Sequence, residues 1–282
     1  MTDDLRATIR SQASPGATAL LDQLAALGTP HNDERKTPRD VHDQQVATLH
    51  ALAAAGLPRQ DALRFALAAP WRPLVGPLFA ALPLTRAERV LVLQAFVRPE
   101  DDQHYPVLDL SRQELDHVPP ECADVVVTPA NIGSDDQPVP YREINLGYNP
   151  LTALDGAALA ALAAFEGVHL IAYKHATLPA ELGAALPRLL LLNVSWGDLR
   201  EFPAELAQAT RLRSLRFNWT SVRELPETFA TLTDLHTIEA SETPLGEALI
   251  ALADGADPTA PHLAAAARTR AMLDALGASI EL

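Results

Sequence analysis

The feature that most constrains this chain is a repeat with a period of 23 residues. The segment LLLLNVSWGDLREFPAEL at residues 189–206 aligns with LRSLRFNWTSVRELPETF at residues 212–229. The matched columns are Leu192 with Leu215, Val194 with Phe217, Trp196 with Trp219, Leu199 with Val222, Phe202 with Leu225, Pro203 with Pro226 and Leu206 with Phe229. A period of this length predicts an array of stacked structural units rather than a domain with one central core.

The same columns continue in both directions along the chain. Earlier repeats occupy residues 107–119, 141–154 and 165–182, and residues 238–245 continue three columns. Apolar residues alternate at the fourth and sixth positions, so each repeat predicts a short strand with one face turned inward. One repeat cannot bury that face alone, so repeats must stack and the ends must be capped. We expect parallel strands to begin near residues 107, 143, 167, 191, 214 and 237.

These columns resemble the leucine-rich-repeat family, whose pattern LxxLxLxxNxLxxLP is followed by a variable return segment. The resemblance covers about residues 105–250, or six repeats, with about a dozen extra residues between the first two. It implies an α/β solenoid, a right-handed superhelix with a parallel sheet on its concave side. The sequence departs from the family in the asparagine column, which is kept only at Asn149. The other residues in that column are Gln113, Tyr173, Gly197, Thr220 and Thr243.

Helical segments are expected on both sides of the repeats. Residues 1–104 predict an α-helical N-terminal region of four or five short helices, separated by proline and glycine. Within it, Thr85 and Glu88 form a capping-box pattern that opens a helix at Arg86. Residues 251–282 predict a C-terminal helical cap that ends at Gly277.

The acidic charge of the chain is concentrated in the repeats. Residues 105–249 hold 9 basic and 20 acidic side chains, whereas residues 1–104 are nearly balanced at 11 and 12. An acidic surface repels phosphate, which argues against nucleic acid or an anionic membrane as the partner. A neutral or basic protein or peptide is the expected ligand. We expect the chain itself to be a monomer.

Several features indicate a cytoplasmic protein. Cys122 is the single cysteine, so an intrachain disulfide and a cysteine-based zinc site are both ruled out. Asp3 and Asp4 stand where a secretory signal carries basic residues. No apolar stretch approaches the roughly 20 residues of a membrane-spanning helix. Export by a non-classical or specialised route stays open, and the Ala, Leu and Arg bias suggests a bacterial genome.

The family resemblance implies that strand residues between the core leucines point to the concave side. Two of the three tryptophans, Trp196 and Trp219, then lie on neighbouring rungs about 4.8 Å apart. The expected ligand-binding strip consists of Tyr148, His169, Asn193, Trp196, Arg216, Asn218 and Trp219. Tryptophan, tyrosine and arginine are enriched at binding hot spots. The alternative interpretation is that the two indoles close the lip of the core.

Sequence patterns that would indicate catalysis are weaker than those that indicate binding. Cys122 and Asp124 resemble the Cys-x-Asp of bacterial leucine-rich-repeat ubiquitin ligases, but only 32 residues follow the repeats here and that catalytic region is large. His169 and Ser195 could approach across one rung, yet no acid is evident to orient the histidine. The nine histidines show no paired metal-ligand spacing. We therefore expect no enzyme activity, no metal and no cofactor.

The sequence favours a non-catalytic module that binds a protein or peptide on its concave face. A second hypothesis is a bacterial effector or enzyme adaptor, in which the N-terminal helical region acts and the repeats select the target. A structural scaffold is the third. Residues 1–104 are longer than a minimal cap, which keeps the second hypothesis open.

Overall fold

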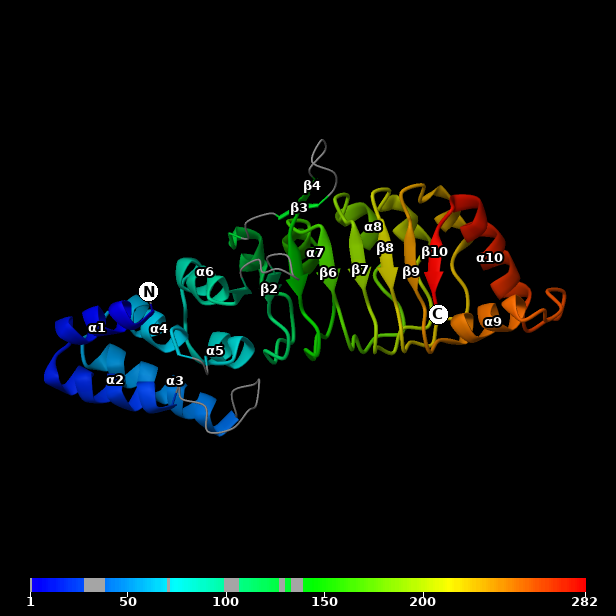
Figure 1. Cartoon of the computed structure of the whole chain (residues 1–282). Helices are drawn as coiled ribbons and strands as arrows, with labels where there is room; N and C mark the ends of the chain where they lie inside the picture. The colour runs from blue at the N-terminus through cyan, green and yellow to red at the C-terminus, as the bar shows by residue number, and fades with distance from the viewer. Residues whose placement is uncertain (1, 28–38, 70–71, 99–106, 127–129, 133–138) are drawn as a thin grey trace. The chain divides into compact units, whose positions relative to one another are not determined.

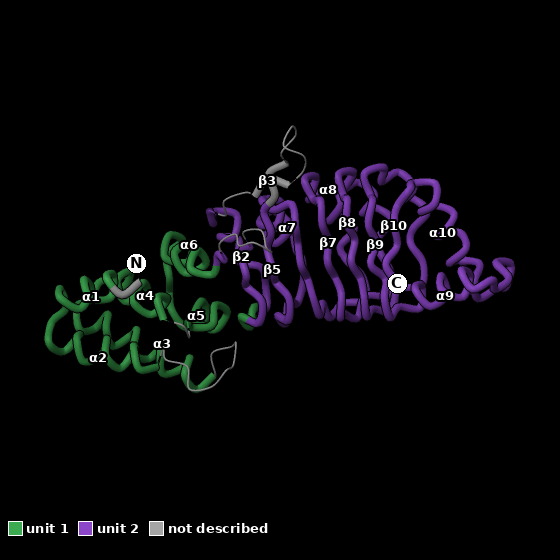
Figure 2. The backbone as a smooth tube through the Cα atoms, viewed as in Figure 1, with its two compact units in different colours: residues 1–96, 113–115 green, residues 97–112, 116–282 purple. Residues whose placement is uncertain are grey.

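The computed structural model describes residues 2–27, 39–69, 72–98, 107–126, 130–132 and 139–282. The chain divides into two compact units, which Figure 2 shows in different colours. The helical unit consists of residues 1–96 and 113–115, and the repeat unit consists of residues 97–112 and 116–282.

The helical unit is built from short helices that bury one face each. They are α1 (Thr2–Gln12), α2 (Pro15–Leu27), α3 (Arg39–Ala54), α4 (Arg59–Leu67), α5 (Val75–Ala81) and α6 (Arg86–Gln94). The capping box that opens α6 is confirmed, because Thr85 accepts the Glu88 N–H and the Glu88 side chain accepts the Thr85 N–H. Helix α1 was not expected, since its sequence is polar overall and offers few apolar residues. Leu21, Leu52, Leu63 and Phe65 are fully buried in this unit.

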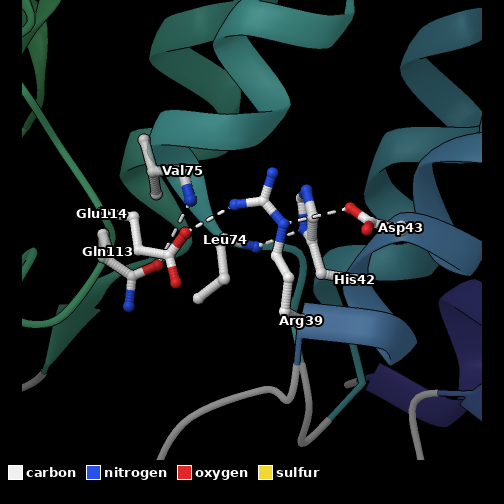
Figure 3. A network of polar contacts seen from close by, with 7 residues as sticks. All are labelled: Arg39, His42, Asp43, Leu74, Val75, Gln113 and Glu114. Carbon is white, nitrogen blue, oxygen red and sulfur yellow. Dashed lines mark hydrogen bonds and ion pairs between the residues drawn. The ribbon is translucent and has the colours of Figure 1, made fainter.

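A polar network joins α3, α5 and the segment 113–115 within the helical unit (Figure 3). The first N–H groups of a helix have no partner inside the helix. At α5, Nδ1 of His42 accepts the Leu74 N–H at 2.9 Å and Oε1 of Gln113 accepts the Val75 N–H at 3.3 Å. The Gly76 N–H donates to the Gln113 carbonyl at 2.9 Å. A Cβ on Gly76 would lie 2.2 Å from the Glu114 carbonyl oxygen, so only glycine fits.

His42 is the buried centre of this network, and only 1% of it is exposed. Burial, followed by the charge of Arg39, lowers the pKa of His42 below its ordinary value of 6.5. Arg39 itself lies between two carboxylates and donates to Asp43 at 3.2 Å and to Glu114 at 2.6 Å. His42 is therefore a neutral hydrogen-bond acceptor in the folded chain.

We expect the helical unit to lose stability as the pH falls below about 6.5, because the unfolded chain then binds a proton at His42 that the folded chain resists. Above the unfolded pKa the contribution of neutral His42 is fully present. Thermal unfolding between about pH 7.5 and about pH 5.5 measures the loss. The control is His42→Asn, which keeps an acceptor near the Leu74 N–H but cannot titrate. An unchanged pH dependence in this variant would assign the effect to other groups.

The repeat unit is organised by a parallel sheet of short strands. In the described residues the strand order is β1-β2-β5-β6-β7-β8-β9-β10. The bounds are β1 (Val97–Arg98), β2 (Val107–Asp109), β5 (Glu143–Asn145), β6 (Gly167–His169), β7 (Leu191–Asn193), β8 (Ser214–Arg216), β9 (Thr237–Glu239) and β10 (Ser279–Glu281). Figure 1 shows the strands side by side in chain order. The six expected strands and their first residues are confirmed.

Two strands extend the sheet beyond the repeats. β1 pairs antiparallel with β2, and β10 pairs parallel with β9. Neither was expected, because strands of two or three residues outside the repeat carry no periodic signal. Between the first two repeats, β3 (Ala130–Ile132) and β4 (Val139–Tyr141) form an unexpected antiparallel pair. The rest of that insertion, residues 127–129 and 133–138, lies outside the described residues.

The return segments carry one helical turn or more in each repeat. They are η1 (Pro120–Asp124), α7 (Gly156–Leu162), α8 (Leu182–Ala185), η2 (Ala204–Gln208) and η3 (Glu227–Thr231). Pro203 and Pro226 immediately precede η2 and η3. Proline fixes φ near the helical value, which suits the start of such a turn.

Two of the departures from the asparagine column, Thr220 and Thr243, have a structural explanation. Asn149 donates to the Leu146 carbonyl of its own repeat at 2.9 Å and to the Leu110 carbonyl of the preceding one at 2.8 Å. Thr220 and Thr243 donate to the carbonyl three residues earlier, each at 2.7 Å. A buried threonine hydroxyl thus replaces the asparagine amide within the repeat.

Two helices follow the last repeat, α9 (Pro244–Ala253) and α10 (Ala264–Leu276). The stop at Gly277 is confirmed, since this residue adopts φ +69°. Helix α9 corrects our interpretation of Leu245, which was expected only as a repeat column. Leu245 is buried as predicted, but from a helix that Thr243 caps by accepting the Gly246 N–H at 2.9 Å.

Leu215 lies between Leu192 and Ile238 in the sheet register, and at most 1% of each of these residues is exposed. Leu215→Ala should lower the free energy of unfolding by about 2–5 kcal/mol, because it removes apolar contacts and leaves a cavity. Chemical denaturation measures the loss. The exposed Arg223→Ala is the control and should stay within about 0.5 kcal/mol. Equal losses in both variants would mean that the inward register is wrong.

Candidate ligand-binding face

One backbone conformation recurs at the end of every strand of the array. We call these positions the left-handed column, because each residue adopts φ between 56° and 63°. The column consists of Arg112, Tyr148, Ala172, Trp196, Trp219 and Glu242. Positive φ costs an ordinary residue roughly 1–2 kcal/mol, and glycine or asparagine usually occupies such places. Here six other side chains accept the strain, so the surrounding structure must impose it.

Backbone hydrogen bonds between rungs hold this column in place. The Tyr148 N–H donates to the Ile171 carbonyl at 2.8 Å, and the Trp196 N–H donates to the Asn218 carbonyl at 2.8 Å. Arg112, Ala172 and Trp219 repeat the same bond. The parallel ladder therefore continues past the strands, and it sets the side chains of the column one above another.

The aromatic members of the column are exposed. The exposed fractions are 47% for Tyr148, 53% for Trp196 and 47% for Trp219. The two indoles stack with centroids 4.7 Å apart and an interplanar angle of 11°. The Arg112 guanidinium lies 4.6 Å from the centroid of the Tyr148 ring. Rings that are half exposed are not sealed into the core.

In the next column inward on the sheet, several side chains accept hydrogen bonds from backbone N–H groups. We call it the strand column, and it consists of Asp109, Asn145, His169, Asn193, Arg216 and Glu239. Asp109, Asn145 and Asn193 each accept the N–H of the residue two positions later, at 3.0–3.2 Å. Such local bonds stabilise the turn at the strand end. Asn193 is only 9% exposed, so its main role in this structure is to hold the turn.

His169 has an acidic neighbour that the sequence did not reveal. Its Nε2 lies 3.4 Å from Oε2 of Glu143, and its Nδ1 lies 3.4 Å from Nδ2 of Asn193. Glu143 is the first residue of the neighbouring strand and lies outside the expected strip. Ser195 is 5% exposed and donates its backbone N–H to Asn193. The histidine therefore faces an acid and an amide rather than a nucleophilic serine.

Arg216 and Asn218 share one carboxylate. Nε of Arg216 lies 2.9 Å from Oε1 of Glu239, and Nδ2 of Asn218 donates to Oε2 of the same residue at 3.1 Å. Oδ1 of Asn218 accepts the Ser241 N–H at 2.8 Å. Both side chains are thus held by their own chain, with Arg216 still 38% exposed.

The seven expected strip residues fall into two groups. Tyr148, Trp196 and Trp219 project as exposed rings from the left-handed column. His169, Asn193, Arg216 and Asn218 lie beside them and contact residues of their own or a neighbouring rung. The sequence could not indicate the left-handed backbone, because neither glycine nor asparagine marks it. The one indication in the sequence was that Trp196 and Trp219 occupy the same position in neighbouring repeats.

A cavity lies elsewhere in the repeat unit, beside α10. It has a volume of ≈670 Å³, and its lining includes Phe202, Leu225 and Met272. Arg268 at its edge lies 3.2 Å from a carboxylate oxygen of Glu224. The lining suits an apolar group, and part of its charge is already neutralised within the chain.

Cys122 lies in η1 and is fully buried. Burial, helped by the neighbouring charge of Glu121, raises the pKa of its thiol far above the ordinary value. A nucleophilic cysteine requires an accessible thiolate. The environment of Cys122 is therefore opposite to that of the ligase cysteine which it resembles in sequence.

Cys122 should react with a thiol-specific dye only after the chain is unfolded. In the native protein burial blocks both access and ionisation, whereas in denaturant the chain should take up one equivalent, matching its single cysteine. Absorbance of the released dye measures the rate of labelling in the native protein and in denaturant. Rapid labelling of the folded protein would contradict the buried assignment.

Across the described ranges, no three His, Cys, Asp or Glu side chains come together to hold a metal ion. Among these same residues, no helix has both the length and the apolar character to cross a membrane.

The repeat columns, the parallel sheet and the return segments define the repeat unit as a leucine-rich-repeat solenoid. No family model matches the chain, and no curated protein matches it. A leucine-rich-repeat protein of Leptospira interrogans is similar, with 19% identity over 60% of this chain and 35% of that one and a TM-score of 0.39.

Two further solved structures are similar to the chain. An internalin of Listeria monocytogenes shows 24% identity over 36% of this chain and 28% of its own, with a TM-score of 0.31. A chain in the Drosophila melanogaster SNF/U2A′ complex shows 24% identity over 45% of this chain and 70% of its own, with a TM-score of 0.32. The matches thus span less than half of the first two proteins.

Proposed function

We propose that this chain is a non-catalytic recognition module, which binds a protein or peptide on the concave face of the solenoid, the outward side of its sheet. The ligand surface in this proposal is the strip of Tyr148, His169, Asn193, Trp196, Arg216, Asn218 and Trp219. The three exposed rings supply the contact energy, and the four polar residues frame them.

One observation carries the proposal. The left-handed column accepts arginine, alanine and glutamate on three of its rungs, so the fold does not require an aromatic ring there. Tyr148, Trp196 and Trp219 nevertheless expose about half of their surface. Large rings held on a rigid scaffold lose little conformational freedom on binding, and they dominate protein interfaces. This favours recognition over packing as the reason for the aromatic residues.

The charge of the repeats indicates the kind of partner. The 9 basic and 20 acidic side chains of residues 105–249 favour a neutral or basic protein surface over a nucleic acid. Opposite charge speeds the association of the two proteins, while contacts of the rings that become buried on binding set the affinity. We further propose that the chain acts as a monomer.

The double variant Trp196→Ala with Trp219→Ala tests this function. Each hot-spot ring commonly contributes about 2 kcal/mol or more, so the double variant should bind a captured and purified partner at least about 100-fold more weakly. Its melting temperature should change little, because the indoles are half exposed. Titration calorimetry and circular dichroism melting on the same sample measure both quantities.

Glu242→Ala is the matched control, since it changes the same column without removing a ring. It should keep both the affinity and the fold. A large loss of melting temperature in the tryptophan variant, with unchanged affinity in the folded fraction, would retire the binding claim and support a packing role.

A further inference from the structure

The left-handed column contains a gap between two ring faces. Its order along the solenoid is Arg112, Tyr148, Ala172, Trp196, Trp219 and Glu242. Ala172 is the one small residue in this order, and it stands between a phenol and an indole. The stacked pair shows that rings on adjacent rungs lie 4.7 Å apart. Two such steps separate the Tyr148 and Trp196 rings by about 9 Å.

Each of the two rings has one face already covered. Arg112 covers Tyr148 from the preceding rung at 4.6 Å, and Trp219 covers Trp196 from the following rung at 4.7 Å. The covered faces are therefore those turned away from Ala172. In the described part of the chain, no further ring or cation stacks on either ring. The two remaining faces look toward each other across Ala172.

The width of this gap suits one flat group. A planar group stacked between two rings needs about 3.5–4.0 Å on each side, or about 7–8 Å in all. The separation of about 9 Å admits such a group with slight adjustment of the rings. An aliphatic chain or an ammonium group would fill the same gap with poorer contact.

We propose that the gap at Ala172 is a slot for an arginine side chain of the protein ligand, inserted between Tyr148 and Trp196. The guanidinium is planar, stacks on aromatic faces and is weakly hydrated. The net acidic charge of the repeats favours a cation over a neutral ring. Arg112 on Tyr148 shows that a guanidinium stacks on a ring of this column. This inference rests on the proposed function and names the group that the surface recognises.

The blocked tripeptide acetyl-Gly-Arg-Gly-amide is the probe, used with the full chain. Insertion between two rings should shift its side-chain protons upfield in the nuclear magnetic resonance spectrum, with a Kd of about 1 mM. The lysine tripeptide should bind at least tenfold more weakly. Equal binding of the lysine peptide, or tighter binding of the phenylalanine peptide, would overturn the assignment to arginine.

Ala172→Trp is the decisive variant, because tryptophan occupies the same backbone conformation on the next two rungs. It should fill the slot and weaken arginine-peptide binding at least tenfold. Glu242→Trp is the matched control, since it adds an equal indole to the column outside the slot and should leave binding unchanged. Tyr148→Ala removes one wall and should weaken binding independently. Unchanged binding in Ala172→Trp and Tyr148→Ala would overturn the slot.

A captured protein partner separates this inference from the proposed function. A partner that binds Ala172→Trp as tightly as the original chain, but fails to bind the double tryptophan variant, would overturn the slot and leave the binding face standing. A partner that binds the double tryptophan variant as tightly as the original chain would overturn the proposed function. The slot would then stand or fall on the tripeptide titrations alone.

Discussion

Hydrogen bonds between neighbouring rungs determine the rest of the repeat unit. Each repeat strand from β2 onward pairs with the next in one unshifted parallel register, so Leu192, Leu215 and Ile238 stack inward on one line. The same ladder continues beyond the strands to Tyr148 and Trp196. Each repeat contacts chiefly its neighbours in such an array, so position within the repeat fixes both the height and the face of a side chain. The backbone thus sets the direction of the outward side chains.

The ladder also explains why a strained backbone is tolerated on every rung. A left-handed residue costs roughly 1–2 kcal/mol, and the bond from its N–H to the next rung helps to offset that cost. The strain belongs to the turn and is independent of the side chain, since Ala172 and Trp196 adopt nearly the same φ. Folding therefore does not fix which side chain occupies this column, and another constraint can select it.

The repeat phase was sufficient to predict the strands and the inward leucines, because a period of 23 residues leaves one consistent register. It also placed Trp196 and Trp219 side by side. It could not reveal β10, whose three residues pair with β9 only after α10 has returned the chain to the sheet. Nor could it show that Glu143 reaches His169, since that contact depends on side-chain direction across two strands. The repeat pattern predicts the register of the strands, whereas contacts between side chains on different rungs follow only from the three-dimensional structure.

Three carboxylates on the outward face already have partners within the chain. Asp109 lies 3.0 Å from Arg98, Glu143 lies 3.4 Å from His169, and Glu239 lies 2.9 Å from Arg216. A ligand that relied on these carboxylates would have to displace a partner from each, at the cost of desolvating both groups. In the proposed function the net acidic charge would therefore act mainly at a distance, by attracting a basic surface. The rings of Tyr148, Trp196 and Trp219 are the exposed groups, so under the proposed function selection among basic ligands would depend on which cation can also stack.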